Sequence, residues 1–340
     1  MKLYGAIDLH STNSVTVLID EQDNTAYRKR LPNDLKLIIE QLAAYQSRIE
    51  GIVVESTYNW YWLVDGLMEQ GYKVHLANTA AIQQYNGLKY TDDDSDARWL
   101  AHLLRLGVLP EGYIYPKQER PVRDLLRKRS QLVRQRTTNL LSIQNVIVRN
   151  TGSSINANRI KGLTAEEVEN ILGQGDIALA VKSNLSVMQC LSGEIATIEA
   201  AVKERVKLRV EFEKLRTVSG IGKTLALTMM LESGDIRRFA SVGNFASYCR
   251  CVGSQKLSNG KRKGSGNTKN GNKYLAWAFV EAANFAIRFN SKIKSFYQRK
   301  KAKTKAVVAI KAVAHKLCRA CYHIMKDRVA FDVTKAFGQK

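Results

Sequence analysis

The order of strand-like and helix-like patterns in the first 110 residues restricts the fold more than any other feature of the sequence. Apolar runs with strand periodicity occur at about residues 2–8, 13–20, 24–31, 52–55 and 72–76. Helical patterns occupy about 33–47 and 60–70, and a third helix is expected to begin within the acidic run 92–96. Three strands, helix, strand, helix, strand, helix is an order that predicts an α/β domain with a mixed sheet.

Four acidic residues lie at the ends of these predicted elements. Asp8 ends the apolar run KLYGAID, Glu55 ends IVVE, and Asp93 and Asp96 lie where the stretch DDDSDARWLAHLLRL begins. Carboxylates that converge on one point repel each other unless divalent cations lie among them. The acids therefore predict a metal site suited to chemistry on a phosphate backbone. Which aspartate of the run at 92–96 faces the metal stays open: helical spacing favours Asp93 with Asp96, but acids also cap helix starts.

The positive charge of the chain is concentrated after residue 110. The formal net charge is +22; residues 1–110 hold 10 Lys/Arg and 14 Asp/Glu, and the remainder holds 43 and 17. A mildly acidic part followed by a strongly basic part predicts a catalytic module joined to a module that binds a polyanion. Surface charge kept for solubility is the alternative, but it rarely separates along a chain in this way.

Membrane and secretion signals are not expected. No stretch approaches the ~18 apolar residues of a membrane span, and residues 1–20 lack a signal-peptide pattern. Five cysteines, an odd number, indicate reduced thiols in the cytoplasm. A CxC at Cys249 and a CxxC at Cys318, flanked by His315 and His323, are conceivable zinc ligands, but their apolar helix-like surroundings favour packed thiols.

The middle of the chain has a long helical pattern on each side of an excursion. Residues 117–149 and 185–216 repeat apolar residues at three- and four-residue spacings, and the Gly- and Asn-rich start of 151–183 marks the excursion. The pattern predicts an antiparallel helical hairpin, whose apolar stripe either packs within the chain or pairs with another copy as a coiled coil. Candidate nucleic-acid contacts on it are Arg127, Lys128 and Arg134. The expected domains are 1–112, 113–216 and 217–340.

The segment SGIGKT opens the C-terminal part. A P-loop would need glycine at Thr217 and a preceding apolar strand, and neither is present. A helix-hairpin-helix turn is the better interpretation, with Gly220 and Gly222 opening backbone N–H groups toward a phosphate beside Lys223. A purely structural helical turn is the alternative.

Residues 254–273, SQKLSNGKRKGSGNTKNGNK, form a polar basic segment between two apolar helices. Held at both ends, such a loop is expected to grip a phosphate backbone, although a disordered linker has the same composition. Its cations would lower the pKa of a serine hydroxyl and neutralise a phosphorane, but the residues do not decide among Ser254, Ser258 and Ser265. The candidate phosphate contacts are Lys256, Lys261, Arg262, Lys263, Lys269 and Lys273.

Together these segments resemble the DEDD insertion-sequence transposases related to the Piv DNA invertases. The matching pieces are GAIDLH, VVEST, TDDDSDARWLAHLLRLG, SGIGKTLAL, GDIRRFASVGNFASYC and SNGKRKGSGNTKNGNKYLAWAFVEAA. The resemblance implies an N-terminal domain with an RNase H or RuvC-like fold, a helical hairpin and a mainly helical C-terminal transposase domain. Two departures from the family are Asn259, where glycine is frequent, and Gly253, where proline is frequent.

The resemblance also implies a mechanism. The family's four acids fall on Asp8, Glu55, Asp93 and Asp96 and would bind Mg²⁺ or Mn²⁺, and its serine nucleophile falls on Ser258, six residues before a glycine. The serine would attack a DNA phosphodiester and hold the strand as a phosphoserine, so that rejoining needs no ATP. Family members pair donor and target DNA with a structured guide RNA, and act in the bacterial cytoplasm, at the nucleoid. They assemble as dimers into tetramers in which one subunit's serine completes another's acidic site.

Three other functions compete with this one. A Holliday-junction-resolvase-like endonuclease would use only the four acids and a metal-bound water, and would leave free 5′-phosphates. An actin-like sugar kinase or ATPase would explain DLHSTNS as a phosphate loop, but its second phosphate loop and adenosine site are missing. A non-catalytic RNA-binding scaffold would leave the carboxylates unexplained.

Overall fold

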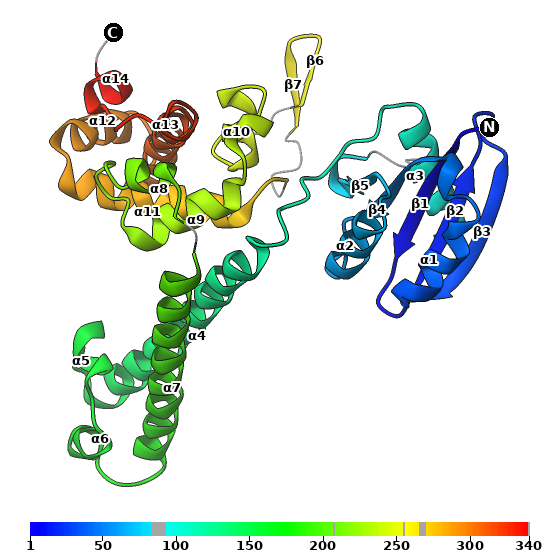
Figure 1. Ribbon diagram of the computed structural model, residues 1–340. Coiled ribbons are helices and arrows are strands. Elements are labelled where there is room, and N and C mark those ends of the chain that lie inside the picture. The colour runs from blue at the N-terminus through cyan, green and yellow to red at the C-terminus, as the bar shows by residue number, and fades with distance from the viewer. Residues whose placement is uncertain (83–92, 207, 254–255, 265–269, 339–340) are drawn as a thin grey trace. The chain divides into compact units, whose positions relative to one another are not determined.

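The computed structural model describes residues 1–82, 93–206, 208–253, 256–264 and 270–338. The chain divides into two compact units, Met1–Lys117 and Gln118–Lys340, each described by itself below (Figure 1). The domain boundary expected after residue 216 stays a prediction.

The N-terminal unit is built on a five-stranded mixed sheet with the order β3-β2-β1-β4-β5. β1 is antiparallel to β2 and β2 to β3, whereas β4 runs parallel to both β1 and β5. The strands are β1 Leu3–Leu9, β2 Asn13–Ile19, β3 Thr25–Pro32, β4 Ile49–Glu55 and β5 Val74–Ala77. All five were expected from the sequence, and the α/β part of the predicted fold class is confirmed.

Side-chain alternation along the strands decides which face carries the acids. On β1 and β4, Leu3, Ile7 and Ile52 pack in one core with helices α1 (Leu35–Ala43) and α2 (Tyr61–Glu69). Ala6 and Val53 pack on the opposite face, against α3 (Asp93–Arg105). Successive side chains of a strand point to opposite faces, so Asp8 and Glu55 share the α3 face with Ala6 and Val53.

The C-terminal unit consists mainly of helices, which agrees with the helical part of the prediction (Figure 1). They are α4 Arg120–Thr151, α5 Ala157–Lys161, α6 Ala165–Leu172, α7 Asp176–Arg205, α8 Val210–Leu215, α9 Lys223–Ser233, α10 Val242–Tyr248, α11 Lys273–Phe289, α12 Ser291–Lys301, α13 Ala306–Asp327 and α14 Val333–Phe337. A small two-stranded sheet joins β6 (Lys256–Ser258) to β7 (Lys261–Gly264).

The long helices α4 and α7 lie side by side and form the expected hairpin, with α5 and α6 in the excursion between them (Figure 1). Ile143, Ile160 and Val181 are fully buried where the excursion folds back on the hairpin. Other apolar positions stay exposed; Leu179 is 60% exposed and Leu141 is 51% exposed. The intramolecular packing is therefore present, and pairing with another copy stays a prediction.

One described helix bears on the expectation that the chain has no membrane-spanning segment. Among the described helices, α7 is long and apolar enough to cross a membrane, by length and composition alone. This helix was not expected from the sequence as a membrane span, because charged and polar residues interrupt its apolar residues. Core helices of folded proteins pass the same test, and Val181, Leu185 and Met188 of α7 pack inside the hairpin.

The core of the C-terminal unit lies around α9, α11 and α13. Cys249, Cys318 and Cys321 are fully buried there among apolar side chains, as expected for packed thiols. Burial raises the pKa of the Cys321 thiol, so this thiol is protonated and unreactive at neutral pH.

A buried ion pair ties the hairpin to this core. Glu232 of α9 is 2% exposed and accepts two hydrogen bonds from Arg127 of α4, at 2.6 and 2.7 Å. Its carboxylate also accepts a hydrogen bond at 2.7 Å from Asn272, which caps the start of α11. The Arg127 guanidinium lies 4.6 Å from the centre of the Tyr274 ring. Glu232 thus links three helices at the base of the hairpin.

Replacing Glu232 with alanine is expected to destabilise the protein by about 3 kcal/mol, because the substitution leaves Arg127 largely buried without its carboxylate. Glu199→Ala is the matched control: Glu199 of α7 pairs at 2.6 Å with Arg129, which also lies on α4, but the Glu199 side chain is 47% exposed. That loss should stay below about 1 kcal/mol. Urea denaturation of both variants measures the difference, and equal losses would contradict a special role for the buried pair.

Candidate active site and nucleic-acid interface

Three of the four predicted acids converge on the α3 face of the sheet. Asp8 is 4% exposed near the end of β1, Glu55 ends β4 beside it, and Asp96 lies in the first turns of α3. Burial raises the pKa of Glu55 to about 8, and a hydrogen bond with Asp8 and the charges of Asp8 and Asp96 act in the same direction. Glu55 thus lies within hydrogen-bond distance of Asp8, and the charge of Asp96 reaches it as well.

The position of Asp96 depends on how α3 is held against the sheet. Ala97, Leu100 and Ala101 of α3 are buried against the strands. At the other end of α3, Arg105 donates two hydrogen bonds to the Asp23 carboxylate, at 2.6 and 2.9 Å, and His102 contacts the same group. Asp23 lies in the turn between β2 and β3. These contacts therefore keep α3 from sliding along its axis relative to the sheet, and so hold Asp96 near Asp8 and Glu55.

Asp93 is the first residue of α3, but its side chain lies outside the described residues, as does all of Asp92. The assignment of Asp93 as the fourth ligand therefore stays a prediction.

His10 was not singled out from the sequence, although it borders the acids. Its Nε2 lies 3.3 Å from Asp8 Oδ2. Its carbonyl oxygen accepts hydrogen bonds from the amides of Asn33 and Asn59, both at 3.0 Å. Asn59 follows β4, so these bonds join the loop after β1 to the loop after β4. Only the spacing of His10 two residues after Asp8 could have pointed to it.

The acidic cluster fits a divalent cation of the Mg²⁺ type. Carboxylate oxygens are the ligands that Mg²⁺ prefers, and a cation among them would offset the repulsion that raises the pKa of Glu55. Within the described ranges, no group of three His, Cys, Asp or Glu side chains is already arranged around a metal position. The fit therefore rests on the donor type and on the mutual repulsion of Asp8, Glu55 and Asp96.

Glu55→Gln is expected to change how the stability of the metal-free protein depends on pH. The pKa of Glu55 in the fold, about 8, lies above its usual value of 4.5, so its contribution to stability is full below about pH 4.5 and is lost as the pH rises to about 8. In EDTA, the Tm of the wild type should therefore fall relative to that of Glu55→Gln across this window. Glu40→Gln, an exposed change on α1, should follow the wild type. If the curves of Tm against pH ran parallel for wild type and Glu55→Gln, the close placement of Glu55 beside Asp8 and Asp96 would be contradicted.

The segment around Ser258 was expected to be a loop, and this was wrong in part: residues 256–264 form a β-hairpin. Ser258 ends β6, pairs with Lys261 and is exposed. The two turn residues, Asn259 and Gly260, have φ values of 48° and 70°. Asn-Gly is the preferred pair for such a turn, so Asn259 has a structural reason to replace the family's glycine. The same dipeptide was the sequence signal for the hairpin.

The structure describes the basic residues of this segment to different extents. The side chains of Lys261, Lys263 and Lys273 are exposed. Lys256 and Arg262 are described by their backbone in β6 and β7 only. Three residues of the predicted set lie outside the described residues: Ser254, Ser265 and Lys269. Lys261 and Lys263 are available to a phosphate backbone on the same hairpin as Ser258, and Lys273 is exposed at the start of α11.

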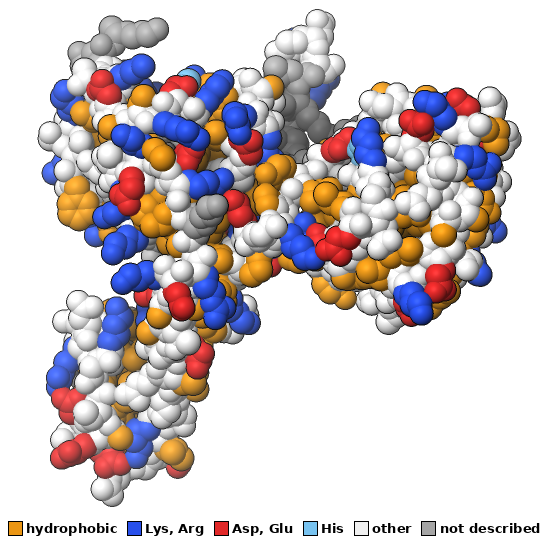
Figure 2. All heavy atoms as spheres, viewed as in Figure 1, with side chains coloured by type: hydrophobic (Ala, Val, Ile, Leu, Met, Phe, Trp, Pro, Cys, Tyr) orange, Lys and Arg blue, Asp and Glu red, His pale blue; other side chains and the backbone are white. Residues whose placement is uncertain are grey.

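The basic residues predicted on α4 divide into two kinds. Lys128 and Arg134 are exposed, whereas Arg127 is held by the buried Glu232, so we correct its assignment from nucleic-acid contact to ion pair. Figure 2 shows Lys and Arg side chains over much of the visible face of this unit. The surface cations, without Arg127, remain suited to a polyanion.

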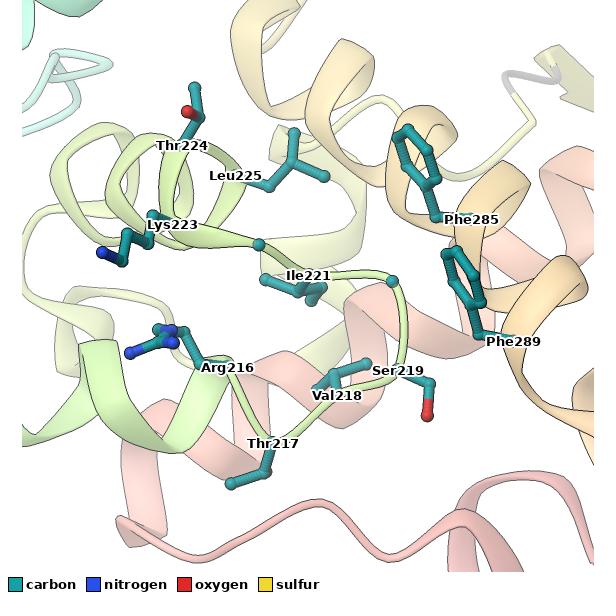
Figure 3. A pocket seen from close by; sticks show the side chains of 12 residues that line it. Arg216, Thr217, Val218, Ser219, Ile221, Lys223, Thr224, Leu225, Phe285 and Phe289 are labelled. Carbon is teal, nitrogen blue, oxygen red and sulfur yellow. The ribbon is translucent and has the colours of Figure 1, made fainter. Parts of the chain in front are cut away.

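The SGIGK turn lies between helices α8 and α9, as a helix-hairpin-helix motif requires, with no strand before it. Gly222 immediately precedes α9 with an extended backbone, and a Cβ there would meet open space. Gly220 has a φ of 95°, and a Cβ there would lie 2.5 Å from the backbone nitrogen of Ala286 in α11. Gly220 is therefore needed for packing, while Gly222 and the exposed Lys223 face solvent. Figure 3 shows this turn beside α11.

Two protein families match the chain. A family model described as "Transposase IS116/IS110/IS902 family" matches residues 212–298, which include the SGIGK turn and Ser258. A second, described as "Transposase" and named for the DEDD transposases of IS110, matches residues 6–150, which include the four acids. A comparison with curated proteins finds no significant match. Residues 6–150 and 212–298 are thus each similar to a transposase domain of the IS110/IS116/IS902 type.

Proposed function

We propose that the protein is an insertion-sequence transposase that cuts and rejoins DNA through a phosphoserine at Ser258, with Mg²⁺ held in a RuvC-like N-terminal site. The observation that carries the proposal is the convergence of Asp8, Glu55 and Asp96 on one face of the sheet. The strand order β3-β2-β1-β4-β5, with β4 parallel to β1, supports an RNase H-like fold. Both family matches support transposition as the activity.

In this mechanism the acids hold the metal and the serine makes the new bond. Asp8, Glu55 and Asp96 would bind the cation, with Asp93 as the fourth ligand. Mg²⁺ bound there would polarise the scissile phosphate and stabilise the oxygens of an in-line displacement. Ser258 Oγ forms a bond to phosphorus as the bridging DNA oxygen leaves, and the serine proton passes to solvent or to the leaving oxygen. One phosphodiester replaces another, so rejoining needs no ATP.

Recombination of a marked element tests this function. Cells would carry a donor plasmid with the element and a target plasmid, and joined products would be amplified across the new junctions. Wild type and the exposed control Glu40→Gln should give junctions, and Asp8→Asn should not. Cut DNA with free 5′-phosphates and no junctions would instead support the hydrolytic endonuclease.

A structured guide RNA and a tetramer built from dimers belong to the same proposal. The excess of basic residues after residue 110 supports a nucleic-acid partner larger than a single cut site. The exposed apolar residues of the hairpin support pairing with another copy. Purification from cells that carry the element, followed by sequencing of bound RNA, tests guidance; RNA of no defined sequence would count against it. We place the activity in the cytoplasm, at the nucleoid.

A further inference from the structure

A pocket of about 670 Å³ opens beside the SGIGK turn. We call it the turn pocket; residues 216–225 line it on one side, and Phe285 and Phe289 of α11 line it on the other. Its size is in the range of about 300–1,000 Å³ that small-ligand sites occupy. None of the residues that line it, all within the described part of the chain, is acidic.

Two exposed phenylalanines form one wall of the turn pocket. Phe285 is 40% exposed and Phe289 is 72% exposed, with ring centres 6.4 Å apart and ring planes within 5° of parallel. Next to them on α11, Ala282 and Ala286 are buried, and the backbone at these two residues lies close to Gly220 of the turn. Neither phenylalanine ring belongs to the core of this unit. A parallel aromatic pair at the surface is a suitable platform for a flat partner.

Positive charge lies on the other side of the turn. Arg216 and Lys223 are exposed, and Figure 3 shows both side chains extending away from the phenylalanines, with the turn between them. Arg288 adds a cation next to the platform, 5.9 Å from the centre of the Phe285 ring. An occupant that crosses the turn thus meets an aromatic surface at one end and cations at the other.

We propose that the turn pocket binds an unpaired stretch of nucleic acid, with a base stacked on Phe285 and Phe289 and the backbone phosphate held near Lys223 and Arg216. This assignment rests on the proposed action on nucleic acid and specifies which form is recognised. A base within a duplex has its faces covered by its neighbours, so the platform selects unpaired nucleotides. An apolar protein segment would use the rings but not the cations.

The test is oligonucleotide binding to the full chain at moderate salt, measured by fluorescence anisotropy. The probes are labelled oligo-dT, oligo-U and a duplex of equal length. We expect the double variant Phe285→Ala, Phe289→Ala to bind the single strands about 5- to 100-fold more weakly, with binding of the duplex unchanged. Val307→Ala, at a 65% exposed site on α13, is the control and should match the wild type. A larger loss with oligo-U than with oligo-dT would identify RNA as the natural source.

Photocrosslinking locates the base independently of the variants. Single strands that carry 4-thiothymidine or 4-thiouridine should crosslink to a peptide that contains Phe285 or Phe289. If single strands bind but crosslink elsewhere, and the double variant binds them as the wild type does, the turn pocket is not the site. If the wild type binds neither single strands nor duplex, the proposed function itself fails.

Discussion

Ser258→Ala is expected to abolish DNA joining, with the rate reduced by roughly 10⁴-fold or more, the scale on which loss of a covalent nucleophile slows other enzymes. The alanine lacks the oxygen that forms the bond to phosphorus, and no other change is expected, because Ser258 is exposed at the end of β6. The rate would be measured as formation of recombinant junctions in a purified system. Thermal unfolding should show an unchanged Tm.

Ser254→Ala and Ser265→Ala are the matched controls for this prediction. Both serines lie in the same basic segment, and the sequence alone does not rank them below Ser258. Each control variant should form junctions within a few-fold of the wild-type rate. If one of them, and not Ser258→Ala, lost joining, the nucleophile would be reassigned to that serine.

Asp8→Asn is expected to reduce strand cleavage by about 10³-fold, because it removes a charged metal ligand worth several kcal/mol to the transition state. The same variant should lose the rise in Tm that Mg²⁺ gives the wild type. Glu40→Gln changes the same charge on the sheet face away from α3 and should keep both properties. A variant that lost cleavage but kept the Mg²⁺-dependent rise in Tm would show that Asp8 acts other than as a ligand.

The N-terminal fold and its acidic cluster were largely predictable because they depend on local periodicity. Apolar alternation located the strands, and the placement of Asp8 and Glu55 at strand ends follows from the pairing of β1 with β4. The contacts of Asp23 with Arg105 and of His10 with Asn59 could not be predicted in the same way. They join residues far apart in sequence, and no periodic pattern marks polar partners.

Three features of the C-terminal unit could not be predicted from the sequence. Arg127 lies in a basic segment and was therefore expected to contact phosphate. Its ion pair with the buried Glu232, over 100 residues away in the sequence, is visible only in the structure. The β-hairpin at Ser258 was missed because lysine and glycine content outweighed the Asn-Gly turn signal. Phe285 and Phe289 lie in an apolar helix, where the sequence pattern does not distinguish exposed from buried aromatic side chains, and their exposure is known only from the structure.

Mass spectrometry of the protein after reaction with its DNA tests the central claim most directly. After incubation with element DNA and Mg²⁺, nuclease digestion and proteolysis, the peptide that contains Ser258 should carry a phosphonucleotide on the serine. The adduct should be absent in EDTA and from Ser258→Ala. Cleaved DNA with free 5′-phosphates and an unmodified Ser258 peptide would contradict the covalent mechanism and would leave a hydrolytic metal-dependent nuclease.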